Sequence, residues 1–514
     1  MAKHSFGEIH LDVETGRDRA PARPEPDTPF RIAILGDFSG RASRGVCETG
    51  AKLASRRAIL IDRDNFDDVL GQLGVQLRLP LAGGGELALE FNDIDDFRPE
   101  ALYQRLDLFR QLKETRARLA DSRTFAAAAA ELGAAARPAA TEGPSASHPQ
   151  TAEPSANSSG AGLLDQIVSG GSGQKPARAV RRPDELRQYV EQITAPHLVP
   201  GPDPRQPELL AQVDRATGDA MRKILHHSQF QALEAAWRVV FLMIRKVETD
   251  VNLKLCLLDI SRDELAADLA SHEDLRQTGI YKLLVEKTVE TAGAEAWSVL
   301  AGNYSFGSSQ EDAVLLARMA TIARAAGAPF VAGADTRVLG FGSFGEMPEA
   351  RKWSGPAEPQ VWQALRALPQ SASVGLAMPR FLLRLPYGRK TDPTEPFDFE
   401  EMQSPPAHED YLWGNPGLAC AMLLAQSFSE SGWEMRPGSH QEIDGLPLHV
   451  FQRDGEPVAK PCAEALLTEP AVEKILELGV MPLVSPVGRD AVRVVRFQSL
   501  ADPPTALAGP WESR

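Results

Sequence analysis

The chain has 514 residues, a formal net charge of −15 at pH 7, and contents of 43% hydrophobic and 24% charged residues. A chain of this length exceeds what one hydrophobic core supports, so we expect two or three domains of a globular protein. Phosphate binding requires clustered lysine and arginine, and the acidic balance therefore argues against nucleic acid as the main partner.

Cysteine usage and the apolar runs indicate the compartment. Four cysteines are scattered without a CxxC pair, which favours reduced thiols over a disulfide framework or a zinc site. The first residues contain no apolar signal region, and no run of about 18 apolar residues occurs, so neither a secretory signal nor membrane insertion is expected. We therefore predict a cytoplasmic protein.

Residues 1–28 form a polar stretch that predicts a disordered tail, and residues 29–125 read as a small α+β domain. Acidic residues and Pro99 then signal a helix start, and four apolar residues follow at the spacing of one helical face. The predicted strands are Arg31–Leu35, Ile59–Ile61, Val75–Leu79 and Glu86–Phe91, and the helical face consists of Leu102, Leu106, Phe109 and Leu112.

Residues 134–180 are rich in Ala, Pro, Ser and Gly, a composition typical of a disordered linker. One apolar island at 162–168 interrupts this linker. It predicts a short amphipathic helix that docks on a partner. Its candidate partner-binding residues are Leu163, Leu164, Ile167 and Val168.

Residues 181–500 alternate between helical and strand patterns, which predicts an α/β domain with a mixed sheet, and residues 501–514 are set apart as a tail. Ser261 and Glu264 match a capping box at the start of a helix. The predicted helices include Pro183–His197, Leu209–Arg245 and Glu311–Ala326; the predicted strands include Leu253–Ile260 and Trp297–Ala301, with a turn at Gly302.

No motif supports catalysis or cofactor binding. The segment Gly36–Gly40 lacks the Gly-Lys-Ser/Thr of a phosphate loop, so we interpret it as a strand followed by a turn. His226 and His227 are adjacent on a predicted helix and point about 100° apart, which disfavours a shared metal. No Gly-x-Ser-x-Gly elbow occurs, while acid–base chemistry by paired carboxylates stays open. We predict no cofactor and no metal.

Arg380, Arg384 and Tyr387 form a further set of candidate partner-binding residues. Arginine is enriched at interfaces, and we favour a structural role for these three residues in ion pairs at a domain or subunit contact.

Ordered sequence segments in both halves carry a family resemblance. In the first half these are Phe30–Gly40 and Glu90–Phe97; in the second they include Ile224–Arg238, Phe341–Pro348, Met378–Gly388 and Tyr411–Asn415. The first half resembles the small subunit (TssB/VipA) and the second half the large subunit (TssC/VipB) of type VI secretion contractile sheaths. In the family these are separate chains, so one polypeptide would join them at a one-to-one ratio.

The resemblance implies a structural sheath component without catalysis, acting through subunit–subunit assembly. The implied partners are other sheath subunits, inner-tube or baseplate proteins, and a ClpV-type unfoldase that would recognise the 162–168 island. The family's large subunit continues into a C-terminal domain beyond the segment that reads Arg496–Leu500 here, and that domain supplies strands between neighbours. A non-polymerising cap, baseplate or unfoldase adaptor is therefore the alternative. Pairing of the two units within one chain is left open.

Overall fold

A computed structural model describes residues 3–6, 9–12, 24–80, 85–121, 124–135 and 206–512 of the chain. The apolar island at 162–168 and the helix predicted at 183–197 lie outside these described residues. We call residues 24–135 the first unit and residues 206–512 the second unit.

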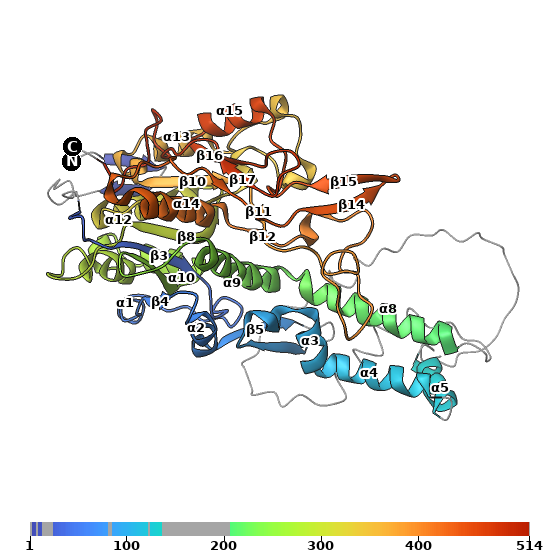
Figure 1. Cartoon of the computed structure of the whole chain (residues 1–514). Helices are drawn as coiled ribbons and strands as arrows, with labels where there is room; N and C mark the ends of the chain where they lie inside the picture. Colours follow the sequence, from blue (N-terminus) through green and yellow to red (C-terminus); the bar gives the residue numbers. More distant parts are fainter. Residues whose placement is uncertain are drawn as a thin grey trace, which may run out of the picture.

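A mixed sheet of nine strands forms the centre of the molecule (Figure 1), in the order β13-β17-β16-β10-β9-β8-β3-β7-β4. The six strands from β16 to β7 run parallel, whereas β4, β17 and β13 pair antiparallel with their neighbours. The mixed sheet expected from the sequence is confirmed. The strands are β3 (Phe30–Gly36), β4 (Ile59–Ile61), β7 (Leu253–Asp259), β8 (Val299–Phe306), β9 (Phe330–Ala334), β10 (Val374–Met378), β13 (Glu442–Ile443), β16 (Val480–Val484) and β17 (Val492–Val494).

Strand β3 of the first unit lies inside the sheet of the second unit. It pairs with β7 over seven residues, from Phe30↔Leu253 to Gly36↔Asp259, and on its other side with β8. All but Arg31 of its residues are buried, as expected for a parallel strand covered on both faces. The two units therefore share one sheet, and pairing within one chain, which the sequence left open, is present.

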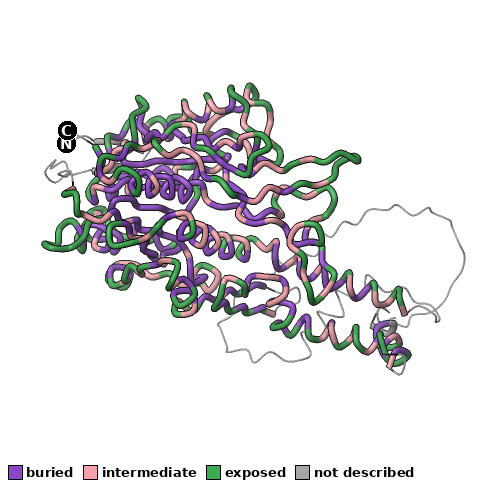
Figure 2. Tube along the Cα trace, viewed as in Figure 1, coloured by how far each residue is buried: buried purple, intermediate pink, exposed green. Residues whose placement is uncertain are grey.

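Helices cover both faces of this sheet (Figures 1 and 2) and create two hydrophobic cores. Ala33 and Leu35 of β3 face the core that contains α10 (Arg262–Ala270), α12 (Gln310–Ala326), α13 (Pro359–Arg366) and α15 (Glu469–Glu477). Ile32 and Ile34 face the other core, with α9 (Ser228–Lys246) and α14 (Pro416–Ser431). Alternate side chains of one strand thus support both cores.

A helical arm extends away from the sheet (Figure 1) and draws on both units. Helix α4 packs against α8 of the second unit, and the amide of Gln206 donates to the carbonyl oxygens of Leu119 (2.7 Å) and Ala120 (2.8 Å). The start of α8 therefore lies against the end of α4. The elements here are β5 (Val75–Pro80), β6 (Glu86–Phe91), α3 (Pro99–Arg105), α4 (Asp107–Ala120), α5 (Phe125–Ala135) and α8 (Gln206–Leu225).

The remaining α-helices and β-strands of the described chain are short. They are β1 (Lys3–Phe6), β2 (Ile9–Asp12), α1 (Ala51–Ala54), α2 (Phe66–Leu73), α11 (Gly279–Tyr281), β11 (Phe381–Leu382), β12 (Trp413–Gly414), β14 (His449–Arg453) and β15 (Glu456–Lys460). The end of the chain, set apart above as a tail, buries Leu507 and Trp511, and the Ala508 N–H donates to the carbonyl oxygen of Ala372 (2.9 Å). No helix among the described residues is long and apolar enough to cross a membrane.

Three local predictions were wrong. The helix through Leu102 and Leu112 is two helices, because the backbone is extended at Leu106. The helix predicted across 209–245 also breaks: α8 ends at Leu225, and His227 is the N-cap of α9, its Nδ1 accepting the Gln229 N–H at 3.3 Å. Strand β8 continues through Gly302 to Phe306: its pairing with β9 shifts register between Ala301 and Ser305 and then resumes, so the predicted turn is an irregularity within the strand.

We predict that cutting the chain between residues 136 and 205 leaves the two units associated. A protease site inserted there should yield two fragments that co-elute on size-exclusion chromatography, because β3 remains hydrogen-bonded to β7 and β8. Ile34→Asp, at a fully buried position, should separate the fragments, whereas Leu60→Asp on the sheet edge, 49% exposed, should not. Separation of the unmutated fragments would contradict the shared sheet.

Candidate functional site: the joint between the two units

The joint begins where β3 ends. Asp259, the last residue of β7, accepts hydrogen bonds from the backbone N–H groups of Phe38 (2.8 Å) and Ser39 (3.0 Å) and from the Ser39 hydroxyl (2.7 Å). On the opposite side, the indole of Trp237 donates to the Phe38 carbonyl oxygen (2.8 Å). The turn at 36–40 is thus held by two elements of the second unit.

A buried carboxylate joins the units beyond this turn. Glu264, fully buried on α10, accepts hydrogen bonds from the guanidinium groups of Arg41 (2.8–3.0 Å) and Arg56 (2.6 and 3.1 Å) of the first unit. Burial alone would raise the pKa of Glu264, but the hydrogen bonds from Arg56 and Arg41 lower it to about 2. Glu48 also contacts both arginines, at 2.8 and 3.2 Å. The charges therefore compensate each other in the interior.

A second carboxylate binds backbone from both units. Asp268, also fully buried, accepts the N–H groups of Gly50 (2.6 Å) in the first unit and of Gly279 (3.1 Å) and Ile280 (2.8 Å) in the second. A Cβ atom at Gly279 would lie 2.4 Å from the Gly50 carbonyl oxygen, so only glycine permits this approach.

Aromatic rings fill the rest of the joint. The rings of Phe30 and Phe428 stack with centroids 4.7 Å apart, and Phe30 also contacts Trp433 at 5.6 Å. Phe91 and Phe97 stack at 4.0 Å, and both meet the Phe230 ring of α9 edge-on. These contacts bury large apolar surfaces of both units and supply the main favourable free energy of the joint.

Two of the predicted partner-binding residues lie in a buried ion network beside the joint. Arg384, 9% exposed, pairs with the fully buried Glu234 (2.9 Å) and Glu401 (2.7 Å). Burial alone would raise the pKa of Glu401, but Arg384 and His226 lower it to about 2. The ring of Tyr387 lies 4.3 Å from the Arg384 guanidinium carbon. The network is therefore internal to the described chain.

Arg98 connects this network to the first unit. Its guanidinium carbon lies 5.4 Å from the centroid of the Tyr387 ring, and it pairs with Asp392 at 2.9 Å. Arg380 lies apart from this contact and pairs with Glu464. The structure thus brings Arg384 and Tyr387 to the joint but not Arg380, and the four island residues fall outside the described part of the chain.

The sequence did not reveal the buried carboxylates Asp259, Glu264 and Asp268 as joint residues. Glu264 was recognised only as part of a capping box, which is present: its side chain accepts the Ser261 N–H at 3.0 Å. Its second role depends on arginines more than 200 positions away. No local sequence pattern predicts the pairing of Glu264 with these arginines.

A cleft of about 630 Å³ opens between α9 and the N-termini of α10 and α12, where parallel sheets commonly bind ligands. Burial raises the pKa of Asp37 in its wall. Arg262 and Arg337 in the wall pair with Asp312 and Asp335.

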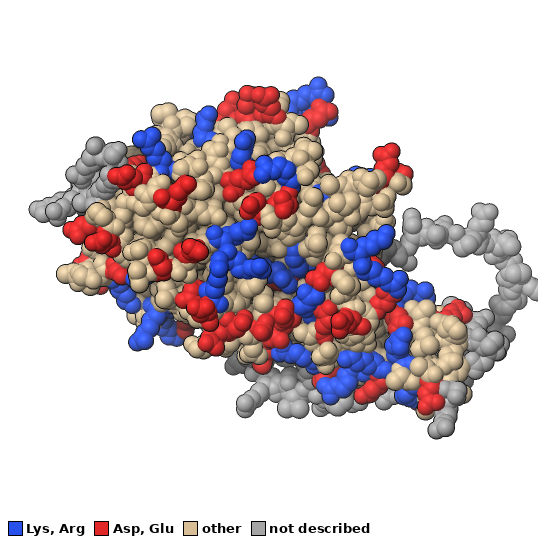
Figure 3. Space-filling model, in the orientation of Figure 1, with Lys and Arg blue, Asp and Glu red and all other residues tan. Residues whose placement is uncertain are grey.

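Among the residues that the structure describes, no group of His, Cys, Asp and Glu could hold a metal ion. The face in Figure 3 carries both charge signs side by side.

The shared sheet, the buried ion pairs and the packed aromatic rings make the two complementary units one folded body. Residues 207–501, more than half of the chain, match the VipB (EvpB) tail sheath N-terminal domain family, and residues 8–135 match the type VI secretion system VipA family. The chain therefore belongs to the type VI secretion sheath proteins and joins a VipA-type and a VipB-type unit in one polypeptide.

Two Pseudomonas aeruginosa proteins are similar to separate parts of the chain. The sheath protein TssC1 is 36% identical over 304 residues, which cover 57% of this chain and 61% of TssC1. The sheath protein TssB1 is 32% identical over 124 residues, covering 23% of this chain and 67% of TssB1. The chain thus spans about three fifths of TssC1 and two thirds of TssB1.

We predict that Glu264→Gln destabilises the protein by about 3 kcal/mol at pH 7, because Arg41 and Arg56 lose a buried counter-ion. The pKa of Glu264 is lowered in the folded state, so its carboxylate contributes stability above its ordinary value of 4.5, and this contribution is lost as pH falls toward about 2. Urea unfolding between pH 7 and pH 3 should therefore show a weaker pH dependence in the variant.

The matched control is Glu295→Gln. Glu295 also pairs with a first-unit arginine, Arg31, and with Lys254, but its side chain is 45% exposed. We expect a loss of less than about 1 kcal/mol. Equal losses for the two variants would refute a special role for the Glu264 pair.

Proposed function

We propose that this chain is a structural subunit of a type VI secretion sheath and acts by assembling with copies of itself rather than by catalysis. The observation that carries the proposal is β3, which lies between β7 and β8 and makes the two family units one folded body. Fusion sets their ratio at one to one and replaces an association equilibrium by an intramolecular one. The family matches at 8–135 and 207–501 support the proposed division into a 29–125 and a 181–500 domain.

We further propose partners in line with this role: neighbouring sheath subunits, and inner-tube or baseplate proteins, in the cytoplasm. Extended and contracted sheaths are two packings of the same subunits with different interface free energies. A subunit that transmits such a change must keep its own fold while its outer contacts rearrange. The buried ion pairs of Glu264 and Arg384 are suited to this task, because breaking either leaves a charge unpaired in the interior.

We predict that the purified full-length chain forms tubules visible by negative-stain electron microscopy. Ile34→Asp should abolish them, because it disrupts the shared sheet, whereas Leu60→Asp provides a control on the same sheet. Discrete particles from the unmutated chain, or density confined to the ends of sheaths built from standard subunits, would contradict self-assembly and indicate a cap or adaptor.

We also propose that the island at 162–168 docks on a ClpV-type unfoldase through its aliphatic side chains. Replacing Leu164 and Ile167 by Asp should abolish unfoldase binding in a pull-down with the full-length chain, because charged side chains cannot enter an apolar groove. Asp165→Asn within the same island is the matched control. Unchanged binding of the double variant would refute the proposal.

A further inference from the structure

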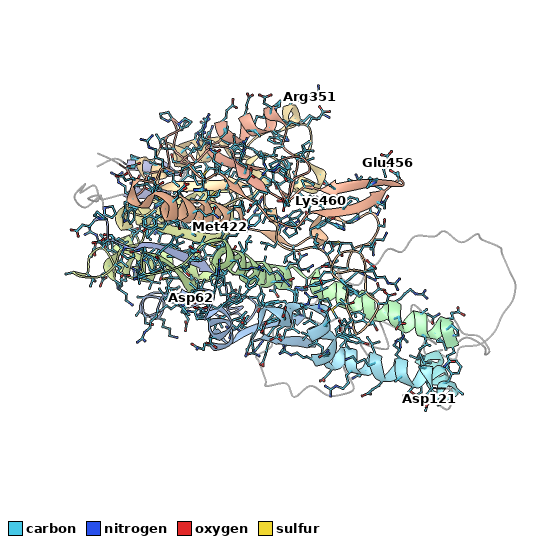
Figure 4. All side chains as sticks on the ribbon, viewed as in Figure 1. Asp62, Asp121, Arg351, Met422, Glu456 and Lys460 are labelled. Carbon is cyan, nitrogen blue, oxygen red and sulfur yellow. The ribbon has the colours of Figure 1, made fainter. Side chains whose placement is uncertain are left out.

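Lys460 lies among aromatic and charged side chains, away from the joint. It ends β15 at the base of the β14–β15 hairpin, whereas Glu456 begins β15 at the projecting end (Figure 4). The Lys460 Nζ atom lies 5.4 Å from the centroid of the Tyr411 ring and 5.2 Å from that of Trp413. Such rings stabilise a cation, but they also displace the water that an ammonium group prefers.

A histidine connects this amine to a carboxylate. Lys460 Nζ lies 3.1 Å from His408 Nδ1, and His408 Nε2 lies 3.0 Å from Glu464 Oε1. A carboxylate can only accept and an ammonium group can only donate, so the two contacts fit a neutral His408 that carries its proton on Nε2 and presents the lone pair of Nδ1 to the lysine. Burial alone would raise the pKa of Glu464, but His408 and Arg380 lower it to about 2, so it is ionised at neutral pH.

The other charged groups near Lys460 have opposing effects. Burial lowers the pKa of Lys460; the carboxylates of Glu464 and Glu409 oppose this, and the cations Arg453 and Arg380 add to it. The balance is a lowered pKa. A larger fraction of this side chain is therefore the neutral amine, the form that acts as a nucleophile.

We propose that Lys460 is a modification site: a reactive amine, aligned with His408 and Glu464, that takes up an acyl group from a thioester. The amine nitrogen forms a bond to the carbonyl carbon, and the carbon–sulfur bond breaks, with its electron pair leaving on the thiolate. The proton lost from nitrogen passes to His408 Nδ1 and then to the thiolate, so the products are an amide and a thiol. Glu464 orients the imidazole for this transfer and stabilises its protonated form.

Acylation would change the base of the hairpin. The amide is neutral, so it loses the cation–π attraction to Tyr411 and Trp413 and the ammonium donation to His408. Because β14 and β15 pair only with each other among the described strands, contacts at their base hold the hairpin in place. Modification would therefore loosen a projecting element of the subunit without touching the shared sheet.

The full-length chain should be incubated with acetyl-coenzyme A at pH 7.5, and acetylation of each lysine followed by mass spectrometry. We expect Lys460 to react several-fold faster than Lys52, whose side chain is 77% exposed. In His408→Gln, which keeps a polar side chain but removes the base, the Lys460 rate should fall to that of Lys52 or below. Lys52 and Lys254 should react at unchanged rates in this variant, which checks its fold.

The pH profile of the unmutated chain provides an independent readout. The acetylation rate at Lys460 should level off at a lower pH than the rate at Lys52, because the neutral amine of Lys460 forms at a lower pH. Any one of three results would overturn the proposal. Lys460 could react more slowly than Lys52 at every pH, its rate could level off at the same pH as that of Lys52, or its rate could be unchanged in His408→Gln.

Discussion

Hydrogen bonding along both sides of β3 is the constraint on which the rest of the structure depends. Strands β7 and β8 do not pair with each other; each reaches the other only through β3. Removing β3 would leave two rows of buried backbone N–H and C=O groups unpaired, at a cost of about 1–3 kcal/mol for each group. It would also remove the side chains that β3 contributes to both cores. Neither unit therefore completes its core alone.

The polar contacts at the end of β3 give this arrangement its specificity. Asp259, Glu264 and Asp268 each receive hydrogen bonds from the first unit, and each has its donors at fixed positions. A shift of one residue in β3 pairing would move Phe38 and Ser39 away from Asp259 and turn every β3 side chain to the opposite face. Apolar burial supplies most of the free energy, and the buried carboxylates favour the same register as the apolar side chains of β3.

Local elements were predictable from the sequence, and their assembly was not. The runs at Arg31–Leu35 and Leu253–Ile260 are strands because their apolar residues cluster between turn signals. These two strands pair although they lie more than 200 positions apart in the sequence, and no periodicity of the sequence predicts such a pairing. The break at His227 was missed because a histidine cap lacks the Ser, Thr, Asp or Asn signature. Of the predicted site residues, Arg384 and Tyr387 lie at the joint, but the sequence alone could not identify their carboxylate partners Glu234 and Glu401.

The central place of β3 also opposes the exchange of units between copies of the chain. A unit that swaps between copies must first open both ladders of β3, which exposes both cores at once. Re-pairing within the same chain needs no diffusion, and Gln206 at the start of α8 is hydrogen-bonded to the end of α4. Loop closure costs only about 0.6 kcal/mol more for each doubling of loop length. Fusion therefore favours the intramolecular joint over exchange almost independently of linker length.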